Sequence, residues 1–435
     1  MIHQISHRCF GPVGPSLLAA AGLALLPTLA SGQLARDSLS LAMVYASVDS
    51  GTPRITAARA GARAAAERIG PARRPPDPEL QLGLMNREIP GFGLSDPLGM
   101  NQIQLMQMIP TAGKLGLAAD VERARASATE ARADDVRWEE RSRAAMAFFD
   151  LFSADHSTRI IRESRRLLRD LVATTEAMYA VGESRQADVL RGQVELARMD
   201  EELLRMEAMR TGAAARLNAV LGRPAGTPVL PAAEPVWPTE LPSADSLVAL
   251  ALARRPMLRS GRQGLAAAQA GERLAGRELW PDLELGLQYG WRGEEGGTMH
   301  MVSLMVGLRL PVWAGSRQKA MRREATAMRE MAAADLQAME AETRGRIGEL
   351  VAAVSRAQRL RALFGGTILP QATTMAGSAA AAYRVGGLDF MTLLDARMNV
   401  NSYRQAAVVA AVELGQAVAE LEMLTATPLL MGGVR

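Results

Sequence analysis

A run of 65 residues without glycine or proline constrains this chain more than any other feature. It extends from Leu117 to Val181 and is rich in alanine, arginine, glutamate and leucine, which favour helix. As one helix it would be about 98 Å long, at about 1.5 Å per residue. Hydrophobic residues make up 48% of the 435 positions but aromatic residues only 4%, so we expect long helices rather than one thick core.

The chain contains two copies of one unit. The segments PELQLGL, from Pro78, and PDLELGL, from Pro281, start 203 residues apart. YAVGESRQADVLRG, from Tyr179, and YRVGGLDFMTLLDA, from Tyr383, start 204 residues apart. Nearly equal offsets indicate a tandem duplication. The proline-rich stretch 222–243 has no helical period and is interpreted as the linker between the copies.

Each copy has the same order of predicted elements: an alanine-rich helix, a β-hairpin and a pair of long antiparallel helices. Alternation of apolar and polar residues predicts the hairpins, and apolar residues three, four and seven apart predict the helix pairs. The expected ranges are helices at 38–69 and 244–279, hairpins at about 78–110 and 281–311, and helix pairs at about 115–221 and 316–427. In the second pair, bends are expected at Gly345, Gly348, Gly365, Gly366 and Pro370.

The first 32 residues have the pattern of a cleaved signal peptide. A basic start is followed by an apolar run, 17–29, and by small residues; the run is too short to span a membrane. The only cysteine, Cys9, precedes this run, so we expect no disulfide and no lipid anchor. The exported chain then consists of repeats at 33–221 and 244–427 with a tail at 428–435.

Charge and residue pattern argue against several functions. The formal net charge is only +4, and arginines alternate with acidic residues along the helices, so we predict no nucleic-acid partner. No catalytic triad, phosphate loop or supported carboxylate pair is present, so we expect no enzyme and no cofactor. Thioethers favour Cu(I), but the 24 methionines are interpreted as packing residues. His300 lies between Met299 and Met301, yet the four histidines have no ligand spacing, and no metal site is predicted.

Four strands cannot close a barrel alone, because a small closed barrel needs about eight. The combination of export signal, duplicated helix, hairpin and helix pair, and paired Y-x-V-G turns resembles the TolC family of outer-membrane efflux proteins. The resemblance implies a mainly α protein with β structure, in which three protomers share a twelve-stranded outer-membrane β-barrel. Their helices continue it as a periplasmic α-barrel, with the linker at its equator.

One subgroup of that family is particularly similar. NREIPGFGLSDPLGM, 86–100, and QMIPTAGKLGL, 107–117, resemble outer-membrane components of heavy-metal efflux systems of the CusC and CzcC type. This implies a passive exit duct for metal cations, supplied by a periplasmic adaptor and an inner-membrane pump of the RND type. The alternatives are a duct for drug efflux or type I protein secretion. From another class, a soluble periplasmic coiled-coil scaffold also fits the helical pattern.

The resemblance assigns a role to the two helix-pair turns. In the family these turns form the periplasmic tip where the adaptor docks. Carried over to this sequence, Val181, Gly182, Val385 and Gly386 become adaptor-facing residues. The competing interpretation is an ordinary helix-ending glycine, which explains the glycines but not the repeated flanking residues.

The resemblance also assigns gate residues. Tyr383 and Asp188 match positions whose bonds hold the tip closed, and Asp395 matches one of two acidic ring positions that line the closed pore. Thr392 occupies the other ring position, and Leu388 replaces a gate arginine. These two departures imply a latch that is weaker or differently built.

Overall fold

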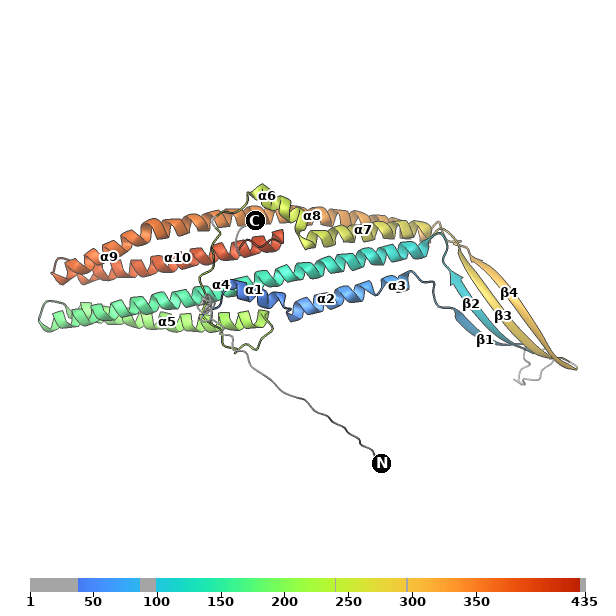
Figure 1. The fold of residues 1–435 in the computed structure, drawn as a ribbon, viewed down its shortest axis with the longest axis horizontal. Helices are drawn as coiled ribbons and strands as arrows, with labels where there is room; N and C mark the ends of the chain where they lie inside the picture. The colour runs from blue at the N-terminus through green and yellow to red at the C-terminus, as the bar shows by residue number, and fades with distance from the viewer. Residues whose placement is uncertain (1–37, 87–98, 239, 295, 431–435) are drawn as a thin grey trace, which may run out of the picture. The chain divides into compact units, whose positions relative to one another are not determined.

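A computed structural model describes residues 38–86, 99–238, 240–294 and 296–430 (Figure 1). The predicted signal peptide, with Cys9, lies outside these residues, as does most of the loop on which the metal-type resemblance partly rests.

The same series of elements occurs twice along the chain. The first copy consists of α1 (Leu41–Asp49), α2 (Pro53–Ala66), α3 (Ile69–Ala72), β1 (Glu79–Met85), β2 (Met100–Ile109), α4 (Lys114–Ala180) and α5 (Gln186–Val220). The second consists of α6 (Ala244–Arg254), α7 (Pro256–Arg277), β3 (Asp282–Glu294), β4 (Gly297–Arg309), α8 (Arg317–Leu363), the π-helical turn η1 (Phe364–Ile368), α9 (Leu369–Arg384) and α10 (Phe390–Thr425).

The long rod is confirmed, since α4 is one helix of 67 residues. The single alanine-rich helices expected at 38–69 and 244–279 are wrong, because each is divided into shorter helices. The divisions fall at Pro53 and Pro256, which start α2 and α7. Proline has no N–H to continue a preceding helix but suits the first helical position.

Only part of the expected bending in the second helix pair is observed. Gly345 and Gly348 lie inside the continuous helix α8, where neighbouring residues maintain the backbone bonding. The interruption is confined to η1, which contains Gly365 and Gly366 and is followed by Pro370 near the start of α9. A π-turn accommodates the backbone bond that the proline removes.

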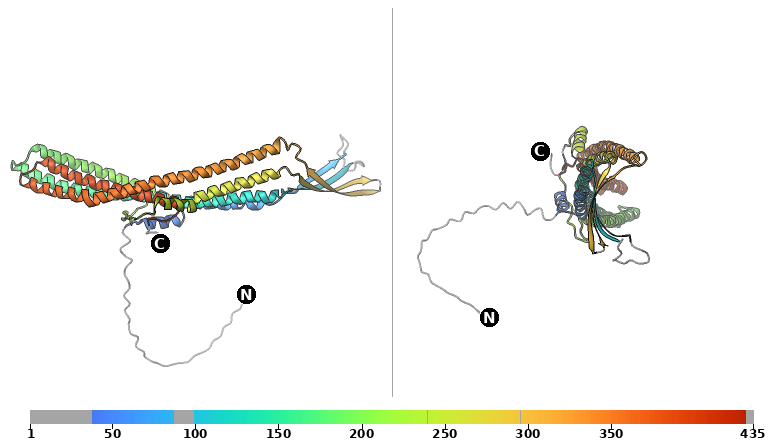
Figure 2. Two further views of the ribbon diagram at one scale, coloured as in Figure 1. Left: turned by 90° about the horizontal axis from the view of Figure 1, so that it is seen from above. Right: turned by 90° about the vertical axis from the view of Figure 1, so that its right-hand side faces the viewer.

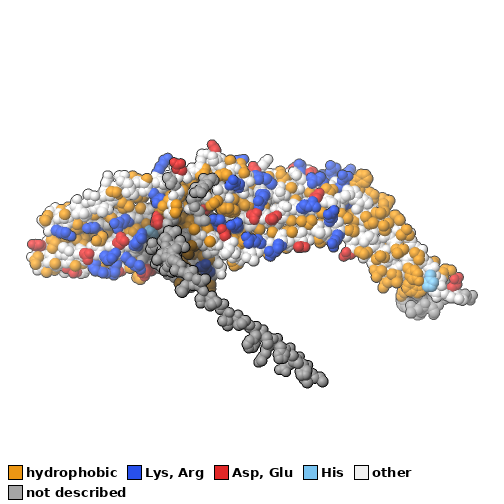
Figure 3. All heavy atoms as spheres, in the orientation of Figure 1, with side chains coloured by type: hydrophobic (Ala, Val, Ile, Leu, Met, Phe, Trp, Pro, Cys, Tyr) orange, Lys and Arg blue, Asp and Glu red, His pale blue; other side chains and the backbone are white. Residues whose placement is uncertain are grey.

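The four strands form one antiparallel sheet in the order β1-β2-β3-β4. The register pairs Leu82 with Ile103, Ile103 with Tyr289, and Tyr289 with Val302, so the apolar alternate positions of all four strands share one face. This face is open: Leu82 is 75% exposed. Figure 3 shows hydrophobic side chains covering the strand end, whereas charged side chains gather over the helices.

A partly buried ion pair joins the sheet to the start of α4. The ammonium of Lys114, in the first turn of α4, donates to Asp282 Oδ1 (2.8 Å) at the start of β3. The N–H of Thr111 donates to the same oxygen (3.1 Å). A residue of the second copy therefore fixes the turn by which the first copy passes from strand to helix.

The two helix pairs lie with their turns at the end opposite to the strands (Figures 1 and 2). Two buried apolar clusters hold them together. The larger one joins α1, α4, α5, α6, α8, α10 and the linker. The smaller one lies near the turns and consists of Ile161, Leu168, Val172, Met199, Met206, Tyr383, Phe390, Leu393 and Leu394. None of the described helices is both long and apolar enough to cross a membrane.

The linker packs across the middle of the helices. Leu39 and Ala232 form a parallel β-bridge, and Trp237 stacks on Phe149 with ring centroids 6.1 Å apart. The buried Glu422 accepts hydrogen bonds from the Tyr45 hydroxyl (2.6 Å) and the Leu430 N–H (2.7 Å). Both ends of the described chain are therefore fixed to the helical core.

α4 and α10 approach closely at Gly415. A Cβ atom at this position would overlap the ring of Phe149, which is fully buried. The absence of a side chain therefore lets an aromatic residue of α4 pack directly on the backbone of α10.

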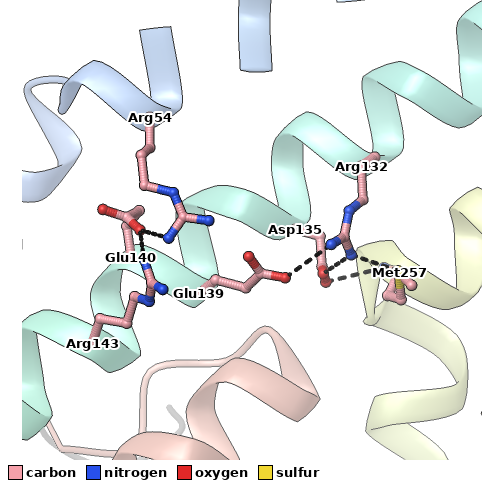
Figure 4. A network of polar contacts seen from close by, with 7 residues as sticks. All are labelled: Arg54, Arg132, Asp135, Glu139, Glu140, Arg143 and Met257. Atoms are coloured by element: carbon pink, nitrogen blue, oxygen red, sulfur yellow. Dashed lines mark hydrogen bonds and ion pairs between the residues drawn. The ribbon is translucent and has the colours of Figure 1, made fainter. Parts of the chain in front are cut away.

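A polar network joins α2, α4 and α7 (Figure 4). Asp135, on α4, accepts hydrogen bonds from the N–H of Met257 (3.1 Å) and from Arg132 (3.1 Å). Met257 is in the first turn of α7, which has no side-chain cap of its own and whose N–H groups lack helical partners. Asp135 thus caps α7 from another helix, even though burial raises the pKa of its carboxyl group.

Glu140 is the second buried acid of this network. Its Oε1 accepts from Arg54 of α2 (2.9 Å) and from Arg143 (3.1 Å). Burial raises the pKa of Glu140, and the Arg54 charge opposes that rise. The acid therefore links the short helix α2 to the middle of α4.

Substitution of Gly415 by alanine should destabilise the protein by about 1–3 kcal/mol, because the added methyl group overpacks the site. Gly377, in α9, is the matched control: nothing lies within 4 Å of its Cβ position, so Gly377→Ala should stabilise by about 0.5–1 kcal/mol. Unfolding of both variants in detergent solution measures the difference. Equal effects would contradict the close approach.

Asp135→Ala should cost about 1–3 kcal/mol of unfolding free energy, because it leaves the Met257 N–H buried without a partner. Asp135→Asn keeps the acceptor oxygen and should lower the unfolding free energy much less. Asp134→Ala is the control, since Asp134 and Arg259 form an exposed ion pair worth about 0–1 kcal/mol. If Asn were as damaging as Ala, the charge rather than the cap would be the stabilising feature.

Candidate functional site

The turn between α4 and α5 has a defined hydrogen-bond pattern. The N–H of Gly182 donates to the Tyr179 carbonyl (3.0 Å), and the N–H of Glu183 donates to the Met178 carbonyl (2.8 Å). These two bonds form a Schellman motif, which requires a left-handed residue after the helix. Gly182 has a φ of 82° and supplies that conformation at little cost.

The turn between α9 and α10 repeats this pattern. The N–H of Gly386 donates to the Tyr383 carbonyl (3.0 Å), and the N–H of Gly387 donates to the Ala382 carbonyl (2.9 Å). Gly386 has a φ of 73°. The helix-ending motif therefore accounts for both glycines without any partner.

The flanking valines are not explained in this way. Val181 is 72% exposed and Val385 is 82% exposed, although the cap geometry does not need an apolar side chain at either position. Both turns lie at the same end of the described chain (Figure 1). They place two exposed apolar side chains where the resemblance locates the adaptor.

The two equivalent tyrosines have different surroundings. Tyr383 is 5% exposed; its hydroxyl lies 3.1 Å from Thr175 Oγ1, and its ring packs edge-on against Phe390. Tyr179, at the same place in the first copy, is 46% exposed. Tyr383 thus joins the second helix pair to α4. Residue pattern alone gave no indication that Thr175 is its partner.

Asp188 and Asp395 lie near the starts of α5 and α10. The structure brings Tyr383 to Thr175 and shows no bond between Tyr383 and Asp188 in the described chain. Asp395 is exposed, and Asp188 is half-buried. Neither carboxylate forms an ion pair with any described residue of its own chain, so each can interact with something outside it.

The two positions that depart from the family pattern have local structural roles. The hydroxyl of Thr392 donates to Asp389 Oδ2 (2.7 Å), and its N–H donates to Asp389 Oδ1 (3.0 Å). These bonds cap α10 and lower the pKa of Asp389. Leu388 packs against the smaller apolar cluster. Neither residue supplies a charge to the tip.

An open hollow of about 650 Å³ lies beside the linker, between α4 and α5. Its acidic side chains are paired with arginines, as in the pairs Arg210 with Asp155 (2.6 Å) and Arg162 with Glu207 (2.9 Å). Burial, assisted by Arg159, lowers the pKa of His156. No group of three or more His, Cys, Asp or Glu side chains in the described residues could hold a metal ion. The hollow has no nucleophile paired with a base.

Comparisons with known proteins agree with this architecture. The family model described as outer membrane efflux protein matches residues 44–223 and 247–427. No curated protein matches the chain.

Solved structures with this fold include three outer-membrane proteins. The OprN outer-membrane channel is 20% identical with a TM-score of 0.71, covering 90% of each chain. VceC from Vibrio cholerae is 17% identical with a TM-score of 0.74, covering 89% of this chain and 96% of its own. CusC is 15% identical with a TM-score of 0.78, covering 89% of this chain and 92% of its own.

At these identities the structural similarity shows the fold, and it confirms the predicted TolC-like architecture of long helices and a four-stranded sheet. The family match covers most of the chain and falls in two segments, one on each side of the linker. The chain belongs to the outer membrane efflux protein family.

Proposed function

We propose that the protein is a passive outer-membrane exit duct made of three copies of the chain. The observation that carries the proposal is the four-stranded sheet, which has an aliphatic face open to the surroundings and an opposite face of polar residues and methionine. Exposed apolar areas of this kind mark contact with lipid or a partner. β1 and β4 are the edges of the sheet. Pairing β4 of one copy with β1 of the next would give the backbone N–H and C=O groups of both edges hydrogen-bond partners.

The turns support the proposed docking of a periplasmic adaptor. Val181 and Val385 extend from two turns with the same hydrogen-bonded cap, so an adaptor would meet preformed apolar contacts and lose little entropy on binding. An inner-membrane pump would supply the energy, and the adaptor would shift the duct toward an open state by binding that state more tightly.

Tyr383 and Asp188 are proposed to contribute to the closed tip in different ways. The buried Tyr383 hydroxyl bonds α9 to α4 within one chain. Asp188, which has no ion pair among the described residues of its own chain, would act across the junction between copies. Asp395 would add one carboxylate per copy to a ring that attracts cations.

Metal cations delivered by an RND-type pump are the proposed substrates, on the basis of the similarity at 107–117 and the structural likeness to CusC. Drug efflux is the second candidate. A strain lacking this protein should lose tolerance to metal salts and keep its tolerance to drugs. The reverse pattern would favour the second candidate, and re-expression of the chain is the control.

Localisation tests the duct against a soluble scaffold. The mature protein should sediment with outer membranes and resist extraction by high salt, because the aliphatic strand face lies in lipid. A soluble periplasmic marker provides the control. Release of the protein by osmotic shock would contradict the duct.

Combining Tyr383→Phe with Asp188→Ala should raise single-channel conductance in a planar bilayer, because both contacts that restrain the tip are removed. Tyr179→Phe is the matched control, since this tyrosine occupies the equivalent position but is half-exposed. Conductance unchanged in the double variant would show that these residues do not hold the tip closed.

A further inference from the structure

All seven methionines of the four described strands lie on one face of the sheet. Register pairs such as Leu82 with Ile103 define the aliphatic face, and alternate residues belong to the other face. The methionines occupy these alternate positions: Met85, Met100, Met106, Met108, Met299, Met301 and Met305.

The segregation is complete in both directions. Every leucine, isoleucine and valine of the four described strands lies on the aliphatic face, and the methionine face otherwise carries glutamine, glycine, serine and charged residues. Methionine and leucine usually replace one another at little cost in packing. If methionine served only as an apolar filler, leucine would be expected on this face as well.

Two methionine side chains of this face, Met305 and Met100, lie against glycines of β3. Gly286 pairs in register with Met106 on one side and Met305 on the other. Met305 Cε lies 3.1 Å from the position that a Gly286 Cβ atom would occupy. Met305 thus covers a site that has no side chain of its own, with Gln104 Nε2 3.8 Å away, and Met106 is the register partner on the other side.

A second arrangement of this kind surrounds Gly290. Met301 is its register partner on β4, and Met100 Cε, from β2, lies 2.8 Å from the position of a Gly290 Cβ atom. Gly286 and Gly290 are both buried, and one methionine, Met305 or Met100, lies over each of them. These glycines leave room in which two sulfur atoms can converge.

Neutral amides lie between the two glycine sites, and beyond Gly290 the cationic Arg292 donates to Met299 Sδ (3.6 Å). Gln288 donates to Gln102 Oε1 (2.5 Å) between the two glycine sites. Farther along the face, Glu284 is neutralised by Arg309 at 2.7 Å. Hard divalent cations need charged or multiple oxygen ligands, whereas neutral thioethers select soft ions such as Cu(I).

We propose that this face carries a series of thioether sites for soft monovalent cations, Cu(I) or Ag(I), centred on Gly286 and Gly290. The interpretation of these methionines as packing residues, which sequence pattern favours, does not explain their restriction to one face. The inference deepens the proposed metal-efflux function, and it rests on that function only for the direction of transport.

The test is a titration of the full-length protein, purified in detergent and labelled with carbon-13 at the methionine methyl groups. Silver(I) should shift the methyl resonances of Met100, Met106, Met301 and Met305 in a saturable way, whereas Mg²⁺ should not. Met106→Leu with Met305→Leu should weaken binding by about tenfold or more, as loss of ligands to a metal does.

Met328→Leu with Met331→Leu is the matched control. These methionines of α8 are exposed, more so than the half-buried methionines of the proposed sites, but they lie outside the sheet, so their loss should leave silver affinity unchanged. Circular dichroism establishes that each variant is folded, and Met106→Gln with Met305→Gln provides a second pair that suits a polar face. Shifts spread equally over all exposed methionines, or none at millimolar silver, would overturn the proposal.

The inference and the proposed function can fail separately. Saturable silver binding in a protein whose deletion leaves metal tolerance intact would retain the thioether sites and remove the metal-efflux function. Loss of metal tolerance on deletion, with full rescue by the Met106→Leu and Met305→Leu double variant and no silver binding, would retain the metal-efflux function and remove the thioether sites.

Discussion

The unbroken helix α4 is the element on which both copies of the unit pack. α1, α2 and α5 contact it from the first copy, and α7 and α10 contact it from the second. These contacts depend on different interactions: Phe149 packs directly on Gly415 of α10, and Asp135 caps α7. A break in α4 would separate these contacts, which explains why residues 117–180 of this helix contain neither glycine nor proline.

The two copies keep the same backbone plan but differ in their chemistry. Glu140 and Thr343 lie 203 residues apart, and each accepts a hydrogen bond from an arginine near the start of a short helix: Arg54 (2.9 Å) and Arg255 (2.5 Å). The acid in the first copy pairs with a charge, whereas the threonine in the second accepts as a neutral group. The two donors are not at equivalent positions, since Arg54 follows Pro53 and Arg255 precedes Pro256. The copies therefore make a polar contact at the same place with different donors and acceptors.

The repeating order of elements can be predicted well from the sequence, because it depends on local residue patterns. The glycine-free rod, the alternating strands and the Y-x-V-G turns depend on neighbours a few residues apart. The division of the first helix at Pro53 is harder to predict. Proline is also common in the first turn of a helix, so the sequence around Pro53 does not distinguish one helix from two. The burial of Tyr383 could not be predicted, because its partner Thr175 is 208 residues away.

The methionine face illustrates the same limit for a candidate site. Met299, Met301 and Met305 alternate visibly within β4, but their relation to Met106 appears only when Gly286 is known to lie between them. Pairing across strands sets that register, and a shift by one residue would place the methionines on the aliphatic face.

In the proposed duct, ions would meet two different chemistries in sequence. Asp188 and Asp395 form no ion pairs within the part of the chain that the structure describes, so the periplasmic tip would attract cations regardless of type. In the strand region Lys114 pairs with Asp282 and Glu284 pairs with Arg309, and the side chains around Gly286 are methionine and glutamine. Attraction there would depend on the softness of the ion rather than on its charge. Because neutral thioethers bind more weakly than charged ligands, an ion held near Gly286 could also be released, as conduction requires.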